Sequence, residues 1–266
     1  MHGSYNELEG GAQLTSEKRF ELLIKRTERN FSGWDFSYIN DSGRIAEEPL
    51  TWSYGSIVFS LLKNADAMLD MGTGGGEFLS LLQPFPKTIA ATESYPPNVL
   101  LAKNRLEPLG VSVCQISDDD HLPFHDGKFD FIINRHESYS VAELRRILSP
   151  NGLFLTQQVG GQDYYGISRA LGLPANEEFK DWNLKHAVAQ LENGGFVILM
   201  QKEEFPYQRF YDIGALVYYL KAIPWQAPDF DVKKDWDNLY EIHQLIEKQG
   251  YFDVRQHRFL IKARAN

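Results

Sequence analysis

Cysteine is nearly absent from this sequence. One cysteine, Cys114, stands among 266 residues, so a disulfide within the chain and a zinc site built from several cysteines are both excluded. Cys114 lies in the strand-like stretch Val111-Ser-Val-Cys-Gln-Ile116. A small buried hydrophobe is a better interpretation of a cysteine in such a stretch than a nucleophile. We therefore expect no thiol-based catalysis.

Long apolar runs and an excess of positive charge are also missing. No apolar stretch reaches the roughly 18 residues that a membrane-spanning helix needs, and residues 1–6 lack the apolar core of a signal peptide. The formal net charge is −9, which argues against a protein that binds nucleic-acid phosphates over a broad basic surface. We expect a cytoplasmic monomer or homodimer with no membrane partner.

What remains is the composition of a folded protein, with 43% apolar residues. Strand-like and helical patterns alternate strictly, which is typical of a doubly wound parallel sheet. The expected fold is therefore α/β, a doubly wound, seven-stranded, mostly parallel sheet. The expected strands are residues 66–71, 87–93, 111–117, 129–134, 153–159, 196–202 and 259–264.

Four segments are expected along the chain. An α/β core at 51–206 is preceded by an N-terminal helix and aromatic cap at 1–50 and followed by a helical insertion at 207–250 before the last core strand at 251–266. The long aromatic stretch around residues 31–55 is of the kind that acts as a lid over a ligand. Packing of the same aromatic residues on the core is an equally good interpretation.

The most informative stretch is Asp70-Met-Gly-Thr-Gly-Gly-Gly76, which follows the first expected strand. Inside a strand or helix each glycine costs roughly 0.5–1 kcal/mol relative to alanine. Glycines are useful where backbone must approach a ligand closely and present N–H groups at the start of a helix. A dinucleotide site would use the spacing G-x-G-x-x-G, whereas the alternate positions of Gly72, Gly74 and Gly76 differ from it.

The turn resembles the first motif of class I S-adenosylmethionine (SAM)-dependent methyltransferases with a type 11 methyltransferase-like domain. That motif is an apolar run, an aspartate matched by Asp70, and glycines matched by Gly72, Gly74 and Gly76. Glu93 at the end of the second expected strand is similar to the family's next acidic residue. The resemblance implies a Rossmann-like SAM methyltransferase fold, with SAM as the cofactor and S-adenosylhomocysteine as the product.

Two later elements are similar as well. Asp118 precedes Leu122-Pro-Phe124 at the family's usual distance after the third strand, and Asp126-Gly-Lys-Phe-Asp130 leads into the fourth. The resemblance covers residues 65–160 well. It hardly covers the first 50 residues or the 207–250 insertion, which leaves the acceptor side of the site without a family pattern.

The resemblance also implies roles for individual residues. Glu93 would accept hydrogen bonds from both ribose hydroxyls, since a carboxylate offers two acceptor oxygens to a vicinal diol. Asp118 would accept from the adenine amino group, and Asn134 and Arg135 would lie beside the methionine part. The full set of expected cofactor contacts is Asp70, Gly72, Thr73, Gly74, Gly76, Glu93, Ser94, Asp118, Asp119, Asn134 and Arg135.

A candidate proton acceptor is His136, directly after the fourth expected strand, because histidine titrates near neutral pH. Glu137 is placed to orient it. A loop histidine that bonds only to backbone is the competing interpretation. The expected acceptor-side residues are Trp52, Tyr54, Glu137, Tyr139 and Tyr211.

No metal ion is expected. Asp118-Asp-Asp120 with His121 and His125 is the nearest candidate cluster, but Pro123 prevents a helix that would place both histidines on one face. The predicted activity is methyl transfer to a small-molecule acceptor. The family's Asn/Asp-Pro-Pro-Tyr motif for base amines is absent at residue 134.

Two alternatives stay open. The basic segment 18–29 and the tail 255–264 would carry phosphate contacts in an RNA methyltransferase. A SAM-binding protein without methyltransferase activity would carry the same cofactor residues. Nucleic acid is therefore a possible partner, though not the favoured one.

Overall fold

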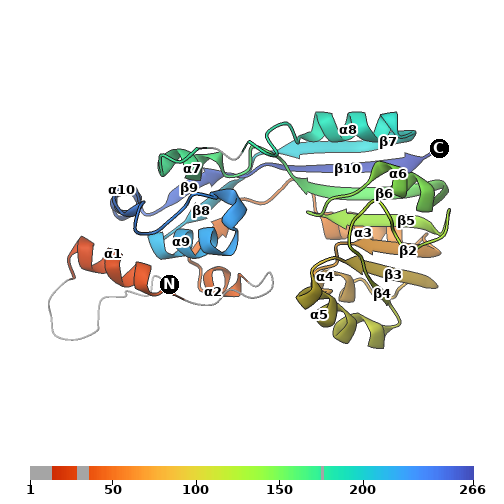
Figure 1. The fold of residues 1–266 in the computed structure, drawn as a ribbon, viewed down its shortest axis with the longest axis horizontal. Helices are drawn as coiled ribbons and strands as arrows, with labels where there is room; N and C mark the ends of the chain where they lie inside the picture. Colours follow the sequence, from red (N-terminus) through yellow and green to blue (C-terminus); the bar gives the residue numbers. More distant parts are fainter. Residues whose placement is uncertain (1–13, 29–35, 175–176) are drawn as a thin grey trace. The chain divides into compact units, whose positions relative to one another are not determined.

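The computed structural model describes residues 14–28, 36–174 and 177–266. The chain divides into two compact units (Figure 1). The first unit combines residues 1–47, 164–176 and 207–254, and the second combines 48–163, 177–206 and 255–266. Residues 164–176, which the sequence assigns to the α/β core, therefore belong to the first unit, together with most of the predicted N-terminal segment and insertion.

A seven-stranded sheet forms the second unit, in the order β4-β3-β2-β5-β6-β10-β7. The pairs β3–β4, β2–β3, β2–β5 and β5–β6 are parallel, and β10 runs antiparallel to both β6 and β7. The predicted mostly parallel α/β sheet is thereby confirmed. Its strands are β2 (Ala67–Met71), β3 (Thr88–Glu93), β4 (Ser112–Gln115), β5 (Phe129–Arg135), β6 (Leu148–Val159), β7 (Phe196–Glu204) and β10 (Arg258–Ala265).

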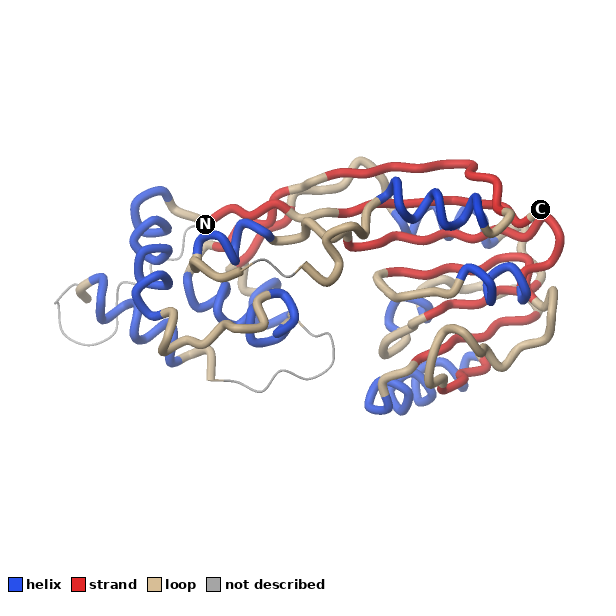
Figure 2. The backbone as a smooth tube through the Cα atoms, turned by 45° about the horizontal axis from the view of Figure 1, so that its top comes forward, coloured by secondary structure: helices blue, strands red, loops and turns tan. Residues whose placement is uncertain are grey.

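Helices cover both faces of this sheet, as the blue segments beside the red strands in Figure 2 show. On β5, Phe131 and Ile133 face one apolar cluster and Ile132 faces the other, which is the period-two alternation of a strand. Because both faces are buried, the central strands are apolar throughout. One cluster includes α3 (Tyr54–Leu62), α4 (Glu77–Ser80) and α5 (Pro96–Leu106), which is followed by η1 (Glu107–Leu109), and the other includes α6 (Val141–Ile147) and α8 (Leu184–Asn193).

The parallel strands bring their carboxyl ends to one edge of the sheet. In the observed register Met71 pairs with Thr92 and with Asn134, and Glu93 pairs with Gln115. Segments far apart in sequence therefore leave the sheet side by side. Ligands of open α/β sheets bind beyond this edge, and it is here that the glycine turn lies.

A buried histidine, His257, directly precedes β10 and contacts the last part of β7 and the residue that follows β6. His257 is fully buried, its Nε2 lies 2.9 Å from Glu203 Oε1, and its ring stacks on Phe205. The backbone N–H of Gly160 donates to the carbonyl of His257 at 2.9 Å. A Cβ on Gly160 would lie 2.1 Å from Nδ1 of His257, so this close approach depends on glycine.

The first unit has its own core and a three-stranded sheet, β1-β8-β9. The strand β8 lies inside the stretch predicted as a helical insertion, and four residues are too short a run to be recognised from their pattern. The elements of this unit are α1 (Ser16–Lys25), α2 (Ser37–Asn40), β1 (Ile45–Glu47), α7 (Tyr165–Ala170), β8 (Tyr207–Phe210), α9 (Ile213–Ala222), η2 (Pro224–Gln226), α10 (Trp236–Gln249) and β9 (Phe252–Arg255).

Part of the expected aromatic cap, residues 29–35, lies outside the described residues. Within the described part of the chain, no helix is both long and apolar enough to cross a membrane. The basic face of α1 is partly engaged inside the first unit, where Arg19 forms an ion pair with Glu247 of α10. Arg19 is one of the basic residues that the RNA methyltransferase alternative assigns to phosphate contacts, and here its partner is a protein carboxylate.

Candidate functional site

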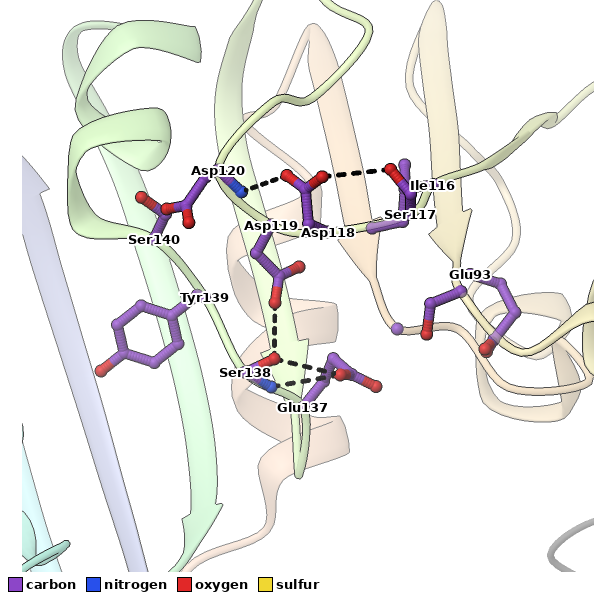
Figure 3. A pocket seen from close by; sticks show the side chains of 12 residues that line it. Glu93, Ile116, Ser117, Asp118, Asp119, Asp120, Glu137, Ser138, Tyr139 and Ser140 are labelled. Carbon is purple, nitrogen blue, oxygen red and sulfur yellow. Dashed lines mark hydrogen bonds between the residues drawn. The ribbon is translucent and has the colours of Figure 1, made fainter.

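A pocket of about 410 Å³ lies in the second unit, at the carboxyl ends of β2, β3, β4 and β5 (Figure 3). Its volume falls within the range of about 300–1,000 Å³ that small-molecule sites occupy. Five of its lining residues carry carboxylates, and no lysine or arginine is among them. The lining residues are Gly72, Glu93, Ser94, Ile116, Ser117, Asp118, Asp119, Asp120, Glu137, Ser138, Tyr139 and Ser140.

The glycine turn contributes Gly72 to the pocket lining and has a backbone conformation that only glycine adopts readily. Gly72, Gly74 and Gly76 have φ values of +66°, +63° and +81°. A Cβ on Gly74 would meet nothing within 4 Å, whereas one on Gly76 would lie 2.7 Å from Leu106 of α5. The turn therefore packs against α5 at Gly76, whereas the space beside Gly74 is empty of atoms from the described residues.

Glu93 is held at the pocket by two backbone N–H groups. It is 4% exposed, its Oε2 accepts the N–H of Gly74 at 2.7 Å, and its Oε1 accepts the N–H of Tyr95 at 2.8 Å. A carboxylate oxygen has two lone pairs, so each oxygen keeps one acceptor position after these bonds are made. Glu93 can therefore accept two further hydrogen bonds from a ligand in the pocket.

Asp70 lies beneath the turn, not in the pocket wall. Its Oδ2 accepts the hydroxyl of Thr73 at 2.7 Å. Burial raises the pKa of Asp70 to about 7, against the opposing effects of Thr73 and of the positive charge of Arg135, while Glu93 raises it further. Near neutral pH this carboxyl is consequently divided between its charged and neutral forms.

Asp118 lines the pocket from a tight turn after β4. Its Oδ1 accepts the N–H of Asp120 at 3.0 Å, its Oδ2 accepts the hydroxyl of Ser117 at 3.1 Å, and Nδ1 of His121 lies 3.1 Å from Oδ1. The hydrogen bonds from His121 and Ser117 lower the pKa of Asp118. The carboxylate stays half-exposed at 48%, within reach of a ligand.

Arg146 on α6 holds the loop that follows this turn, a contribution that the sequence did not suggest. Its guanidinium donates to the carbonyls of Phe124 at 2.6 Å and Leu122 at 3.0 Å. It also forms an ion pair with Glu143, whose Oε2 accepts the N–H of Leu122 at 2.8 Å. An (i, i+3) pair on a helix is usually a surface feature, so no local signal marks this role.

Asn134 ends β5 inside a closed polar network. It is fully buried, its Oδ1 accepts from Thr156 at 2.9 Å and from Gln158 at 2.6 Å, and its Nδ2 donates to the carbonyl of Ser138 at 3.1 Å. Asn134 is not among the pocket-lining residues. Its observed contacts fix the loop 135–140, which does line the pocket.

The next residue, Arg135, is exposed and its guanidinium lies over two aromatic rings. The centroid of Phe78 is 5.1 Å away and that of Tyr54 is 6.0 Å away. The buried hydroxyl of Tyr54 donates to the carbonyl of Asn134 at 3.1 Å, and burial raises the pKa of Tyr54 well above its ordinary value. The Tyr54 phenol is therefore neutral, and its observed contact is a structural hydrogen bond to the backbone.

His136 is held by a chain of hydrogen bonds that begins at Trp52. The indole N–H of Trp52 donates to Oε1 of Gln157 at 2.8 Å, which turns the amide nitrogen of Gln157 toward Nε2 of His136 at 3.1 Å. Because that amide nitrogen can only donate, we assign Nε2 as the acceptor and Nδ1 as the protonated nitrogen.

The other acceptor-side predictions divide between the two units. Glu137 and Tyr139 line the pocket, and the ring of Tyr139 packs edge-on against Phe154 at 5.1 Å and Trp182 at 6.1 Å. Burial raises the pKa of Tyr139. Tyr211 belongs to the first unit, where it follows β8 and is 42% exposed.

The structure thus gathers seven of the sequence-predicted residues around one pocket in the second unit. Tyr211 belongs to the first unit, and the remaining predicted residues are not among those that line the pocket. Three polar residues that hold this arrangement were missed, and the only sequence signal for two of them was a pair of glutamines within an otherwise apolar strand. The gathered residues are Gly72, Glu93, Ser94, Asp118, Asp119, Glu137 and Tyr139. The missed residues are Arg146, Gln157 and Gln158.

Metal ligation receives no support from the described residues. Among them, no group of three or more histidine, cysteine, aspartate or glutamate side chains is arranged to hold a metal ion. This includes the five carboxylates of the pocket.

Comparison with known protein families and curated proteins identifies the region that carries the pocket. Residues 69–156 match a family model described as a methyltransferase domain. Human mitochondrial arginine-hydroxylase NDUFAF5 is 25% identical over 172 residues, which is 59% of this chain and 47% of the human protein. The chain therefore matches about half the length of that relative.

Solved structures share the fold. A suggested methyltransferase of Bacillus halodurans superposes with a TM-score of 0.58 at 18% identity, over 80% of this chain and 99% of that one. The [4+2]-cyclase SpnF superposes with a TM-score of 0.51 at 15% identity, over 94% and 96%. These superpositions establish a common fold, and at identities this low the reaction has to be argued from the site.

Proposed function

Because residues 69–156 belong to the class I SAM-dependent methyltransferase family, we propose that the protein binds SAM in the acidic pocket and transfers its methyl group to a small-molecule acceptor. The observation that carries the proposal is Glu93, a buried carboxylate fixed by two backbone amides at the open side of the glycine turn. Two remaining acceptor positions on that carboxylate suit the two ribose hydroxyls.

The residues around the pocket fit the rest of the cofactor. The left-handed backbone at Gly74, with open space beside it, allows a ligand to approach the chain closely. Ile116 supplies an apolar surface and Asp118 an acceptor at the β4 side, as an adenine ring with an amino group requires. The surrounding carboxylates suit a cofactor that carries a positive sulfonium.

When bound, SAM supplies a methyl group that is already electrophilic. The chain's own task is then to bind and align the reactants, and alignment can supply most of the rate acceleration. His136 remains the proposed proton acceptor for an acceptor that needs one. In the observed arrangement its Nε2 is occupied by Gln157, so proton transfer to that nitrogen requires the amide of Gln157 to move.

A binding and turnover experiment tests this function. Calorimetry with SAM and with S-adenosylhomocysteine should detect binding of both to the wild-type chain and weaker binding to Glu93→Ala. Incubation with SAM and pools of small metabolites should then release S-adenosylhomocysteine. No measurable binding of either ligand would refute the proposal. Binding without release of product from any pool would favour the non-catalytic SAM-binding protein.

RNA methylation is the less favoured alternative. The formal net charge of −9 and the five pocket carboxylates oppose a polyanion. RNA-dependent product release that falls steeply with added salt would support it, whereas salt-insensitive activity on a small acceptor would count against it.

Hydroxylation is a second candidate that the relative's name introduces, since NDUFAF5 is named as an arginine hydroxylase. An acidic pocket would suit a cationic side chain such as arginine. Mass spectrometry of the reacted acceptor separates the candidates, because a methyltransferase adds a methyl group and a hydroxylase adds an oxygen atom.

The proposed setting is a reducing compartment such as the cytoplasm, in keeping with a single free cysteine, Cys114, on β4. The proposed partner is a small-molecule acceptor, with nucleic acid possible but not favoured and no membrane partner, and the proposed assembly is a monomer or homodimer.

A further inference from the structure

The side chain of Glu137 lies directly on the backbone of Gly72. A Cβ on Gly72 would be 2.4 Å from Cγ and 2.8 Å from Oε2 of Glu137. The two residues follow β2 and β5, which are neighbouring strands, and both line the pocket. The glycine therefore provides the space that lets this carboxylate reach the pocket floor.

Few groups in the protein satisfy the carboxylate of Glu137. Its Oε1 accepts the N–H of Ser138 at 3.3 Å and the hydroxyl of Ser138 at 3.4 Å, and both bonds are long. Within the described part of the chain, Oε2 has no hydrogen-bond donor. Burial and repulsion from Asp119 and Glu93 raise the pKa of Glu137. A positive ligand would relieve that repulsion.

The order of the strands determines which part of the cofactor meets this carboxylate. The sheet runs β4-β3-β2-β5 at this edge, with Asp118 after β4, Glu93 at the end of β3, Gly72 after β2 and Glu137 after β5. Neighbouring strands are about 4.8 Å apart. With the ribose on Glu93 and the adenine toward β4, the sulfur attached beyond the ribose lies on the β2 side, over Gly72.

We infer that Glu137 is the residue by which this protein distinguishes SAM from S-adenosylhomocysteine, because its carboxylate faces the position of the sulfonium. The inference rests on the proposed function. In methyl transfer an electron pair of the acceptor's nucleophilic atom forms a bond to the methyl carbon as the sulfur–methyl bond breaks. The electron pair of the broken bond stays on sulfur, and the sulfur becomes neutral. Glu137 then loses its electrostatic partner, which favours release of the product.

Calorimetry with the two ligands tests the inference on the full-length protein. In the wild type SAM should bind more tightly than S-adenosylhomocysteine. Glu137→Gln keeps the shape and removes the charge, so it should weaken SAM binding by roughly ten-fold and change S-adenosylhomocysteine binding by less than about two-fold. This selective change is a readout that does not depend on catalytic turnover.

Two variants serve as matched controls. Asp120→Asn removes one negative charge from the β4 side of the same pocket and should leave the ratio of the two affinities unchanged. Glu93→Gln should weaken both ligands equally, because both contain the ribose. Circular dichroism and urea unfolding on each variant check that the fold is retained.

Three outcomes would overturn the inference. Equal weakening of both ligands by Glu137→Gln would assign Glu137 to the amino group or another part that the ligands share. If Asp120→Asn changed the ratio of the SAM and S-adenosylhomocysteine affinities as much as Glu137→Gln, the preference for SAM would depend on the total charge of the pocket and not on Glu137. Binding of both ligands with no effect of Glu137→Gln would remove the residue from the site. Failure of the wild type to bind either ligand would refute the proposed function itself.

Discussion

Oε2 of Glu93 accepts the backbone N–H of Gly74 at 2.7 Å, which joins the end of β3 to the turn that follows β2. The two residues are 19 positions apart in the sequence. Through this bond the glycine turn orients the carboxylate, and the carboxylate in turn stabilises the left-handed backbone at Gly74. The shape of the turn and the proposed contact with the cofactor therefore involve the same pair of residues.

Replacement of Glu93 by alanine should weaken binding of SAM and of S-adenosylhomocysteine alike. Two charge-assisted hydrogen bonds are lost, each worth about 1.5–3 kcal/mol, so calorimetry should detect at least a ten-fold rise in Kd for both ligands. Glu77→Ala is the control, because Glu77 is exposed and pairs with Arg105 outside the pocket lining. An unchanged Kd in Glu93→Ala would contradict the assignment of the ribose contact.

Two glycines of the turn form a matched pair for testing the contact with Glu137. Gly72 and Gly74 have nearly the same φ, +66° and +63°, but only at Gly72 would a Cβ meet another side chain within 4 Å. Either alanine variant should lose roughly 1–2 kcal/mol of unfolding free energy for the left-handed backbone. Gly72→Ala should lose more in urea unfolding, because it also displaces Glu137.

The double variant Gly72→Ala/Glu137→Ala separates the two causes. Removal of the Glu137 side chain should bring the stability of Gly72→Ala back to about that of Gly74→Ala. Equal losses in the two single variants would mean that the contact between Gly72 and Glu137 does not constrain the turn.

Asp70 should make the stability of the protein fall as the pH rises from about 4 to about 7. The pKa of its carboxyl is about 7 in the folded state and about 3.9 in an unfolded chain, so the folded state binds more protons between these values. The unfolding free energy then decreases with pH across that window. Asp70→Asn cannot titrate and should lack this decrease.

Urea unfolding of wild type and Asp70→Asn at several pH values measures the effect. The unfolding free energy of Asp70→Asn minus that of the wild type should be smallest near pH 4 and should increase toward pH 7 and above. Thr73→Val removes the hydrogen bond that lowers the pKa of Asp70, and should move the upper end of the window to higher pH. A difference that is independent of pH would show that Asp70 does not titrate in this range.

The hydrogen-bond chain from Trp52 predicts the tautomer of His136. Gln157 is oriented by the indole N–H and should hold His136 with its proton on Nδ1. Nitrogen-15 NMR of labelled histidine should therefore report a neutral Nδ1–H ring at pH 7. In Trp52→Phe the amide of Gln157 is free to reverse, and a second tautomer should become populated. An Nε2–H ring in the wild type would contradict the assignment.

Gly160 should not tolerate a side chain. An alanine Cβ would lie 2.1 Å from Nδ1 of the buried His257, and such overpacking typically costs about 1–3 kcal/mol. Gly166→Ala is the control, since its Cβ would lie 3.5 Å from Val254, an ordinary contact. Thermal unfolding should lower the Tm of Gly160→Ala and leave that of Gly166→Ala nearly unchanged.

The sequence predicted the strands that carry the site because their patterns are local. β2 is an apolar run ended by a glycine turn, and β3 ends in a single acidic residue, Glu93. In a doubly wound sheet the carboxyl ends of successive parallel strands meet at one edge. The placement of Glu93 and Asp118 at one edge therefore followed from their positions at strand ends together with the resemblance to the methyltransferase family.

Side-chain roles that depend on packing could not be predicted in this way. Asn134 was expected at the cofactor, and its amide instead bonds to Thr156 and Gln158 on the neighbouring strand β6. The orientation of His136 depends on Gln157, 21 residues away, and on Trp52, which lies 105 residues from Gln157. No local pattern encodes contacts between residues so widely separated.

The sequence by itself determined the glycine spacing, the carboxylates at the strand ends and the succession of strands and helices along the chain, since each depends on residues close together in the chain. Only the tertiary structure decided that Glu137 rests on Gly72 and that residues 164–176 leave the α/β core for the first unit. The physical reason is that these features arise when distant segments compete for the same space, and the outcome depends on side-chain volume and burial across the whole fold.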